Sequence, residues 1–204
     1  MSSIKFYPEL SQTIERALKT QISDERKAVL QELINYISKK LSSNETAHLN
    51  FICTHNSRRS QFSQIWAQTA AAYFAIPVKC YSGGVEVTAF NERAVKAIKG
   101  NGFKVSASGD DNPLYLVSYS DNAQPIKAFS KLFDDAENNC EAFAAVMTCS
   151  HADENCPFIP GTEQRIAVRY EDPKSYDDTA EEADQYDFKS MEIAAEMLYV
   201  FSLL

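Results

Sequence analysis

The segment at residues 51–60, which reads FICTHNSRRS, constrains the fold of this chain more than any other stretch. A short apolar run ends in Cys53, and Arg59 follows after five intervening residues. Beyond Ser60, apolar side chains recur at steps of three and four residues, which is the period of an α-helix. The pattern predicts a strand, a tight loop and a helix in immediate succession, with the loop at the N-terminus of the helix.

A loop in this position suits a tetrahedral oxyanion. The first backbone N–H groups of a helix lack partners inside the helix, and the helix dipole adds partial positive charge there. Arg59 supplies a planar fork of donors that matches two oxyanion oxygens. These surroundings favour the nucleophilic thiolate form of Cys53, to which Ser60 is placed to donate its hydroxyl. Asn56 tolerates the left-handed backbone that tight loops need. The alternative, a buried structural thiol beside solvated arginines, does not explain the placement between strand and helix.

Composition restricts the partners and the compartment. The 204 residues suffice for one domain, or for a domain with an appendage, and the 45% of apolar residues support a core. The formal net charge of −8 disfavours nucleic acid and anionic membranes, so an anionic substrate must be attracted locally. We find no signal-like apolar region at the N-terminus and no stretch of membrane-span length, and we expect a cytoplasmic protein. The odd count of 5 cysteines favours catalytic or redox use over a permanent disulfide framework.

Two helices are predicted before the loop, over residues 8–20 and from residue 23 to about residue 41. They contain no motif that points to chemistry. We therefore interpret residues 1–45 as a helical extension packed on a main domain at 46–204, with a dimer surface or a regulatory arm as alternatives.

Strands and helices alternate after the loop. Strands are predicted at 78–81, 143–148 and 165–170, and helices at 91–98 and 186–201. This alternation is typical of an α/β fold with three layers and a central, mainly parallel sheet, in which anion sites lie at the carboxyl ends of strands. Residues at about 112–130 also predict a β-hairpin that is inserted into the main sheet or extends it.

Cys149 and Cys156 follow the predicted strand at 143–148. The polar segment between them argues for exposed thiols that cycle through a disulfide. Zinc ligation is the alternative, but the spacing is wide and no second cysteine or histidine pair completes four ligands, so we expect no metal. His151 is expected to lie at the surface, or to contact a reacting group without reacting itself. Asp172, which precedes a proline after the last predicted strand, would lie at the same sheet edge as Cys53 and could protonate a leaving group. Its alternative role is to start a turn.

Taken together, these residues resemble the low-molecular-weight protein tyrosine phosphatase superfamily, and most of all its thioredoxin-coupled arsenate reductases. The resemblance covers about residues 47–104 and 142–204, and it implies the phosphatase-like fold. It also implies that Cys53 is the nucleophile, Arg59 the oxyanion clamp and Asp172 the general acid. The residues that it implies around the oxyanion are Thr54, His55, Asn56, Ser57, Arg58 and Ser60. His55 and Arg58 depart from the family pattern, which has glycine and an uncharged residue there.

The reductase resemblance implies an enzyme of arsenic detoxification that reduces arsenate to arsenite through three thiols. Cys53 attacks arsenate, Cys149 then attacks Cys53, and Cys156 moves the disulfide to the surface, where thioredoxin reduces it. No cofactor is expected. The alternative is a cysteine-dependent tyrosine phosphatase that hydrolyses phosphomonoesters and does not need Cys149 or Cys156. A non-enzymatic oxyanion or redox sensor is a third hypothesis.

Overall fold

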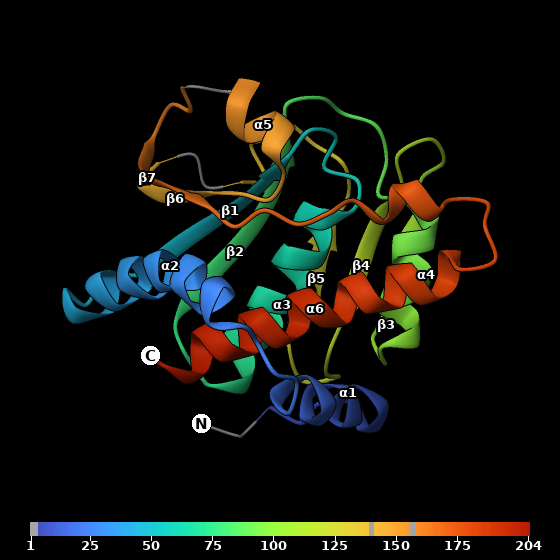
Figure 1. The fold of residues 1–204 in the computed structure, drawn as a ribbon, viewed down its shortest axis with the longest axis horizontal. Helices are drawn as coiled ribbons and strands as arrows, with labels where there is room; N and C mark the ends of the chain where they lie inside the picture. The colour runs from blue at the N-terminus through green and yellow to red at the C-terminus, as the bar shows by residue number, and fades with distance from the viewer. Residues whose placement is uncertain (1–3, 139–140, 156–157) are drawn as a thin grey trace.

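The central sheet consists of parallel strands. The computed structural model describes residues 4–138, 141–155 and 158–204. Its main sheet has the spatial order β2 (Val78–Gly84), β1 (Ala47–Cys53), β6 (Phe143–Met147) and β7 (Thr162–Ala167), and each neighbouring pair is parallel (Figure 1). The predicted α/β class with a central, mainly parallel sheet is thus confirmed.

The helices that apolar periodicity predicts are present. They are α1 (Pro8–Leu18), α2 (Asp24–Ser42), α3 (Arg59–Tyr73), α4 (Glu92–Gly100) and α6 (Glu182–Ser202), and the chain adds α5 (Ser150–Asn155) and the 3-10 helix η1 (Pro173–Tyr176). Side-chain caps fix two of their starts, because Ser23 accepts from the Arg26 N–H at 3.3 Å and Asn91 accepts from the Arg93 N–H at 3.0 Å. Across the described residues, no helix combines the length and the apolar character needed to cross a membrane.

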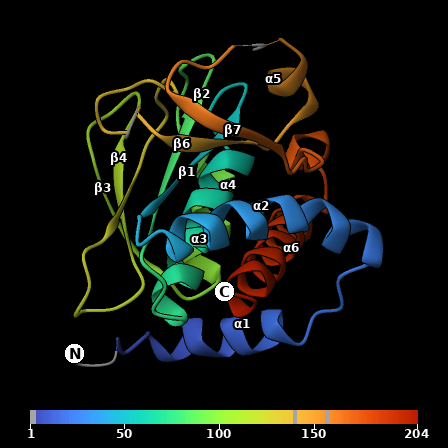
Figure 2. The ribbon, with the colours of Figure 1, turned by 90° about the vertical axis from the view of Figure 1, so that its left-hand side faces the viewer.

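Two apolar clusters on opposite faces of the sheet define three layers. Phe51 and Val146 enter the large core with α2, α3 and α6, whereas their neighbours Ile52 and Met147 enter a small cluster with Ala152 of α5. Successive side chains of a strand point to opposite faces, so this alternation follows directly from the strand geometry. Figure 2 shows α2, α3 and α6 on one side of the sheet and α5 on the other.

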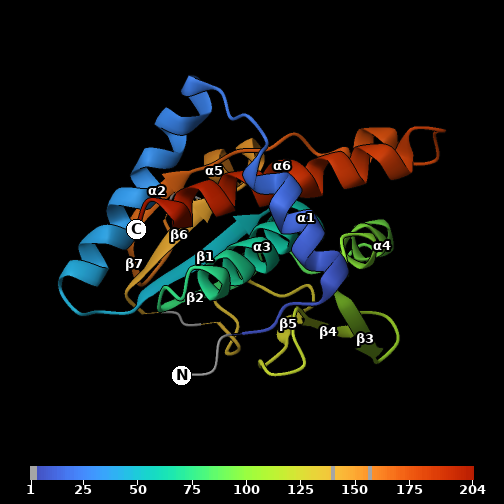
Figure 3. The same ribbon diagram turned by 90° about the horizontal axis from the view of Figure 1, so that it is seen from below.

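The N-terminal helices share the main core. Leu10 and Ile14 of α1 and Leu33 and Ile37 of α2 are fully or almost fully buried, and they belong to the cluster that contains α6. Figure 3 shows α1 and α2 lying against α6. Burial of this extent ties residues 8–42 to the rest of the chain by hydrophobic packing.

The predicted hairpin does not join the main sheet. β4 (Leu114–Ser118) and β5 (Ile126–Ala128) pair antiparallel, but they form a separate sheet in the order β3-β4-β5 with β3 (Lys104–Ser108), a strand that sequence reasoning missed (Figure 3). β3 is largely exposed and polar, so it lacks the apolar alternation that marks a half-buried strand. An isolated parallel bridge between Gly84 and Leu132 links the chain after β5 to the end of β2.

The last strand lies earlier in the sequence than its apolar pattern predicts. β7 covers Thr162–Ala167, not 165–170, because its exposed first half carries polar residues. The pairing with β6 nevertheless continues past the strand end. The N–H of Val168 donates to the Met147 carbonyl at 3.0 Å, and the N–H of Tyr170 donates to the Thr148 carbonyl at 3.1 Å. This extension carries Asp172, two residues beyond Tyr170, towards the edge at which Cys53 lies.

Candidate active site

Cys53 ends β1 and lies at the floor of the predicted loop, with 4% of its surface exposed. Its Sγ is 3.0 Å from Ser60 Oγ. Asn56 adopts the left-handed backbone that was expected, with φ of 47°, and its Nδ2 donates to Ser60 Oγ at 2.9 Å. Because the Ser60 oxygen already accepts from Asn56, its own hydrogen is available for the sulfur of Cys53. Ser60 is therefore positioned to donate a hydrogen bond to the sulfur of Cys53.

The segment after β2 and the segment after β5 support this loop from behind. Both Val85 and Glu86 donate their N–H groups to the Thr54 carbonyl at 2.9 Å. Asn56 Oδ1 accepts from the N–H of Lys131 at 3.1 Å. A Cβ atom at Gly84 would lie 2.8 Å from both Asn56 N and Thr54 O, so only glycine allows this approach.

Arg59, the first residue of α3, is held at the sheet edge by two contacts. Its Nη1 donates to the Tyr170 carbonyl at 3.0 Å, and its Nη2 donates to Asp172 Oδ2 at 2.7 Å. Its buried Nε has no hydrogen-bond partner among the described residues. The second Asp172 oxygen accepts from the Lys174 N–H at 3.1 Å. Asp172 is thus brought to Arg59 as the predicted sheet edge requires, and the guanidinium keeps a donor for a further acceptor.

The two residues that depart from the family pattern have their own partners. Arg58 Nε donates to the Tyr186 hydroxyl at 2.7 Å, and its Nη2 lies 3.3 Å from Asp177 Oδ2. His55 is half-exposed, with its Nε2 3.2 Å from Glu86 Oε2. In this structure the Arg58 side chain is engaged with α6 and with the chain after η1, so the oxyanion contact expected of it stays a prediction.

A basic depression of about 480 Å³ opens beside the loop. Its ionisable lining residues are His55, Arg58, Arg93 and Lys174, together with Glu92. Arg58 pairs with Asp177, and Arg93 pairs with Asp178 and Glu182, so part of this positive charge is neutralised within the chain. Ser57 also lines it, and the Ser57 hydroxyl donates to the Ala89 carbonyl at 2.7 Å.

Cys149 is buried, not exposed as its polar surroundings predicted. Only 1% of its surface is exposed, and its Sγ lies 3.5 Å from the Thr54 hydroxyl oxygen. Thr148 donates both its N–H, at 2.8 Å, and its hydroxyl, at 2.9 Å, to the Ile52 carbonyl, which fixes the end of β6 against the end of β1. The next residue, Cys149, therefore falls beside the loop, and it joins Cys53 in the small apolar cluster.

The segment that follows Cys149 is a short helix rather than a loop. Asp153 of α5 is largely buried and accepts from Arg165 Nε and Arg169 Nε, both at 2.8 Å. Burial alone would raise the pKa of Asp153, but the hydrogen bonds from Arg169 and Arg165 outweigh it and lower that pKa. His151 Nδ1 lies 3.2 Å from the Thr54 hydroxyl. The helix is thus fastened over the small cluster by β7 and the residues after it.

The other cysteines are separate from this group or lie outside the described residues. Cys80 on β2 is buried, and burial raises the pKa of its thiol far above the ordinary value. Cys156, the predicted third thiol, and Cys140 lie outside the residues that the structure describes.

Comparisons with known proteins point to a common family and fold. No protein-family model matches this chain. An arsenate reductase of Halalkalibacterium halodurans is 30% identical to it over 132 residues, which cover 65% of this chain and 78% of the relative. An arsenate reductase of Bacillus subtilis is 30% identical over 138 residues, which cover 68% of this chain and 82% of the relative.

Solved structures share the fold at lower sequence identity. A low-molecular-weight protein tyrosine phosphatase from T. tengcongensis superposes with a TM-score of 0.54 at 16% identity, over 78% of this chain and 100% of that chain. A low-molecular-weight phosphotyrosine phosphatase from Vibrio cholerae O395 gives a TM-score of 0.53 at 11% identity, over 76% and 94%. The predicted phosphatase-like architecture is confirmed by these matches.

Proposed function

The chain belongs to the arsenate reductase family, and from that premise we propose that it reduces arsenate to arsenite with Cys53 as the nucleophile. One observation carries the proposal beyond family membership. The Cys149 thiol is 3.5 Å from the hydroxyl of Thr54, the residue next to Cys53. A second thiol at this place serves reduction, whereas hydrolysis of an ester does not use it.

The first step is attack by the Cys53 thiolate on arsenic. The loop N–H groups and Arg59 hold the arsenate oxygens, and Ser60 stabilises the thiolate until the sulfur–arsenic bond forms. The hydroxyl group that departs from arsenic takes a proton from Asp172 and leaves as water. Asp172 is bonded to Arg59 at 2.7 Å, so the entering oxyanion must displace the carboxylate from the guanidinium or share it.

In the second step the Cys149 sulfur attacks the Cys53 sulfur. The sulfur–arsenic bond breaks, and arsenic keeps the electron pair and leaves as arsenite. The two thiols lose the two electrons that arsenic gains, which gives a Cys53–Cys149 disulfide. Burial of Cys149 in the cluster of Cys53 supports this internal exchange, since neither sulfur has to leave the sheet edge.

In the third step Cys156 attacks Cys149, releases Cys53 and leaves a Cys149–Cys156 disulfide. We propose thioredoxin as the dithiol that reduces this pair, and a cytoplasmic location in which it is kept reduced. Cys156 lies outside the described residues, so its role is carried by its position in the sequence alone.

Phosphomonoester hydrolysis is the second candidate, because the loop with Arg59 and Asp172 contains what that reaction needs. Cys53 would take up the phosphoryl group while Asp172 protonates the leaving oxygen, and water would then attack phosphorus, release inorganic phosphate and free Cys53. The basic depression beside the loop would accept a phosphorylated side chain.

One set of variants separates the two candidates. We expect Cys149→Ser to abolish arsenate turnover coupled to thioredoxin while hydrolysis of para-nitrophenyl phosphate persists. Cys53→Ser should abolish both activities, because both begin with attack by its sulfur. The matched control is Cys80→Ala, a buried cysteine on β2 outside the cluster of Cys53, which should retain both. Arsenate turnover that survives in Cys149→Ser would contradict the three-thiol relay.

A further inference from the structure

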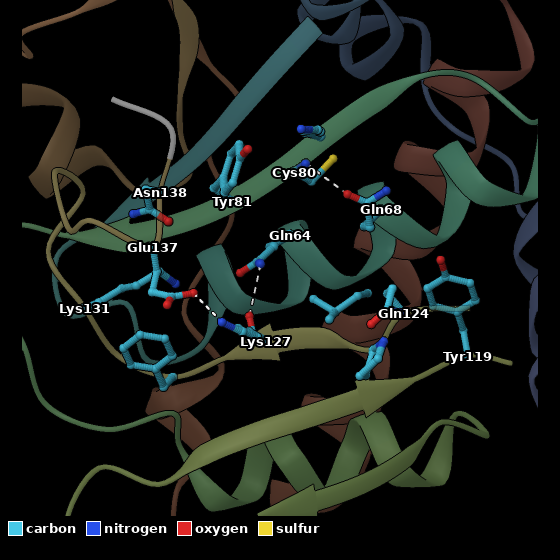
Figure 4. Close-up of a pocket in the computed structure, with 14 residues that line it drawn as sticks. Gln64, Gln68, Cys80, Tyr81, Tyr119, Gln124, Lys127, Lys131, Glu137 and Asn138 are labelled. Atoms are coloured by element: carbon cyan, nitrogen blue, oxygen red, sulfur yellow. Dashed lines mark hydrogen bonds and ion pairs between the residues drawn. The ribbon is translucent and has the colours of Figure 1, made fainter. Parts of the chain in front are cut away.

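A second pocket, separate from the proposed catalytic residues, lies between α3, β2 and the chain around β5. It measures about 310 Å³, and its walls include Gln64 of α3, Tyr81 of β2 and Lys127 of β5 (Figure 4). In Figure 4, Lys131 and Glu137 lie on one side of the pocket, and Tyr119 and Gln124 lie on the other. The proposed relay gives this pocket no role.

Lys131 is the feature of this pocket that calls for a ligand. Only 4% of its surface is exposed, and its Nζ has no hydrogen-bond partner in the part of the chain that the structure describes. Burial lowers the pKa of Lys131 to about 8, opposed by the charges of Asp135 and Glu137, so the amine remains a cation at neutral pH. A buried ammonium group without a hydrogen-bond partner is costly, and an anion that reached it would remove that cost.

The two carboxylates whose charges act on Lys131, those of Asp135 and Glu137, both have other partners. Asp135 Oδ1 accepts from the Glu137 N–H at 2.9 Å. Glu137 Oε2 lies 2.7 Å from Lys127 Nζ, and both side chains are about half exposed. Lys79 also lines the pocket, on β2, and adds positive charge. The electrostatic field in the pocket therefore favours an anion in a chain that is otherwise strongly negative.

The other residues that line the pocket are largely aromatic or apolar. They favour a ligand whose anionic group is attached to a flat apolar ring. The ring centroid of Phe129 is 4.7 Å from Lys131 Nζ, and Tyr81, Tyr119, Pro125 and Ile126 also line the space. A cavity of about 150 Å³ holds one benzene molecule, so the volume here suffices for a ring and a carboxylate. Inorganic phosphate has no apolar part that could contact these walls. Removing its water shell also costs more free energy than removing that of a carboxylate.

We propose that this pocket binds a small aromatic carboxylate, with the carboxylate on Lys131 Nζ and the ring between the aromatic side chains. This site goes beyond the proposed arsenate reduction and stands independently of it. Its ligand pairs with the buried ammonium group through a charge-assisted hydrogen bond. It fills the apolar part of the pocket with its ring.

Calorimetric titration of the full chain with benzoate at pH 7 tests the site. We expect benzoate to bind, and benzamide, which has the same shape without the charge, to bind about tenfold more weakly or worse. Lys131→Met and Lys131→Gln should each weaken benzoate by a similar factor. Because Lys131 contacts Asn56 through its backbone N–H, these variants keep that support of the loop.

Lys99→Met is the matched control, since Lys99 is exposed on α4 and does not line the pocket. It should bind benzoate as the unaltered chain does. Equal affinity for benzoate and benzamide, or undiminished benzoate affinity in both Lys131 variants, would overturn the proposal. Lys131-dependent binding of inorganic phosphate in place of benzoate would also overturn it. The comparison of benzoate with benzamide needs no variant, so a misfolded variant would not spoil the test, and arsenate turnover does not enter it.

Discussion

At the residue scale, Ser60 is the side chain placed to donate a hydrogen bond to the Cys53 sulfur. Its Oγ is 3.0 Å from Cys53 Sγ and accepts from Asn56 at 2.9 Å. We expect Ser60→Ala to slow iodoacetamide alkylation of Cys53 at pH 7 by about tenfold or more, because a hydrogen bond to a charged group contributes about 1.5–3 kcal/mol.

The control for this experiment is Ser63→Ala in the same helix. The Ser63 hydroxyl donates to the Arg59 carbonyl at 2.8 Å, within α3 itself. Its alkylation rate should stay within about twofold of that of the unaltered chain, since hydroxyl bonds within a helix contribute little. Equal rates for Ser60→Ala and Ser63→Ala would remove Ser60 from its role.

Two adjacent arginines show what the sequence could predict at this scale. Arg59 is the residue that the spacing from Cys53 selects, and it does lie at the sheet edge with Asp172. Arg58 has the same chemistry, yet its partners are Asp177 and Tyr186, more than a hundred residues away in the sequence. No local pattern specifies such partners, because they depend on how α6 packs.

At the scale of elements, the end of β2 requires glycine for close approach. A Cβ atom at Gly83 would lie 2.7 Å from Phe133 N, whereas a Cβ atom at Gly100 of α4 would meet nothing within 4 Å. We expect Gly83→Ala to lower the free energy of unfolding by about 1–3 kcal/mol, as overpacking does. Gly100→Ala should be neutral, or stabilising by up to about 1 kcal/mol, because alanine favours the helix. Urea denaturation of both variants checks this, and equal stabilities would contradict the close contact.

The element that covers Cys149 should loosen when Asp153 loses its charge. The arginine bonds lower the pKa of Asp153, so the stabilisation is present above its ordinary value of about 3.9 and is lost as the pH falls through the lower folded-state value. We expect Asp153→Asn to speed hydrogen exchange in α5 by about tenfold at pH 7. The gap from the unaltered chain should close as the pH falls below about 4.

Glu154→Gln is the control for that experiment, because Glu154 is the exposed neighbour of Asp153 on the same helix. Its exchange in α5 should match that of the unaltered chain at pH 7. A gap in Asp153→Asn that is as large at pH 3 as at pH 7 would show that the ion pairs do not fasten the helix.

At this scale, strands and helices with apolar periodicity could be predicted, and elements without it could not. β1, α3 and β6 follow from their side-chain patterns, whereas the exposed strand β3 has none. The burial of Cys149 was missed for a related reason. It results from the pairing of Thr148 with Ile52, a contact between strands that are far apart in the sequence, and not from the polar residues that follow.

At the scale of the whole molecule, a chain of contacts connects the N-terminal helices to the proposed catalytic arginine. Arg26 of α2 binds Glu196 of α6 with two bonds of 2.7 and 2.6 Å. Glu196 is buried and accepts from the Tyr170 hydroxyl at 2.8 Å, and the Tyr170 carbonyl accepts from Arg59. The packing of α2 against α6 therefore influences the position of Tyr170, whose carbonyl binds Arg59.

Replacing Arg26 should lower the free energy of unfolding more than replacing Glu196. The Glu196 side chain is 4% exposed and the Arg26 side chain 29%, so only Arg26 can turn to water. We expect Arg26→Met to lower the free energy of unfolding by about 1–3 kcal/mol, because it leaves a buried carboxylate without its cation. Glu196→Gln should cost less, since a neutral amide can still accept from Tyr170.

Urea denaturation at pH 7 measures both variants, with Lys27→Met as the control. Lys27 neighbours Arg26 and pairs with Asp24 at 3.2 Å on the exposed side of α2, and such surface pairs contribute about 1 kcal/mol or less. Adding Glu196→Gln to Arg26→Met should recover part of the lost stability. The second substitution removes the buried carboxylate charge that Arg26→Met leaves without a cation. If the double variant is instead less stable than Arg26→Met by the full cost of Glu196→Gln, the two side chains act independently and the contact between α2 and α6 rests on apolar packing alone.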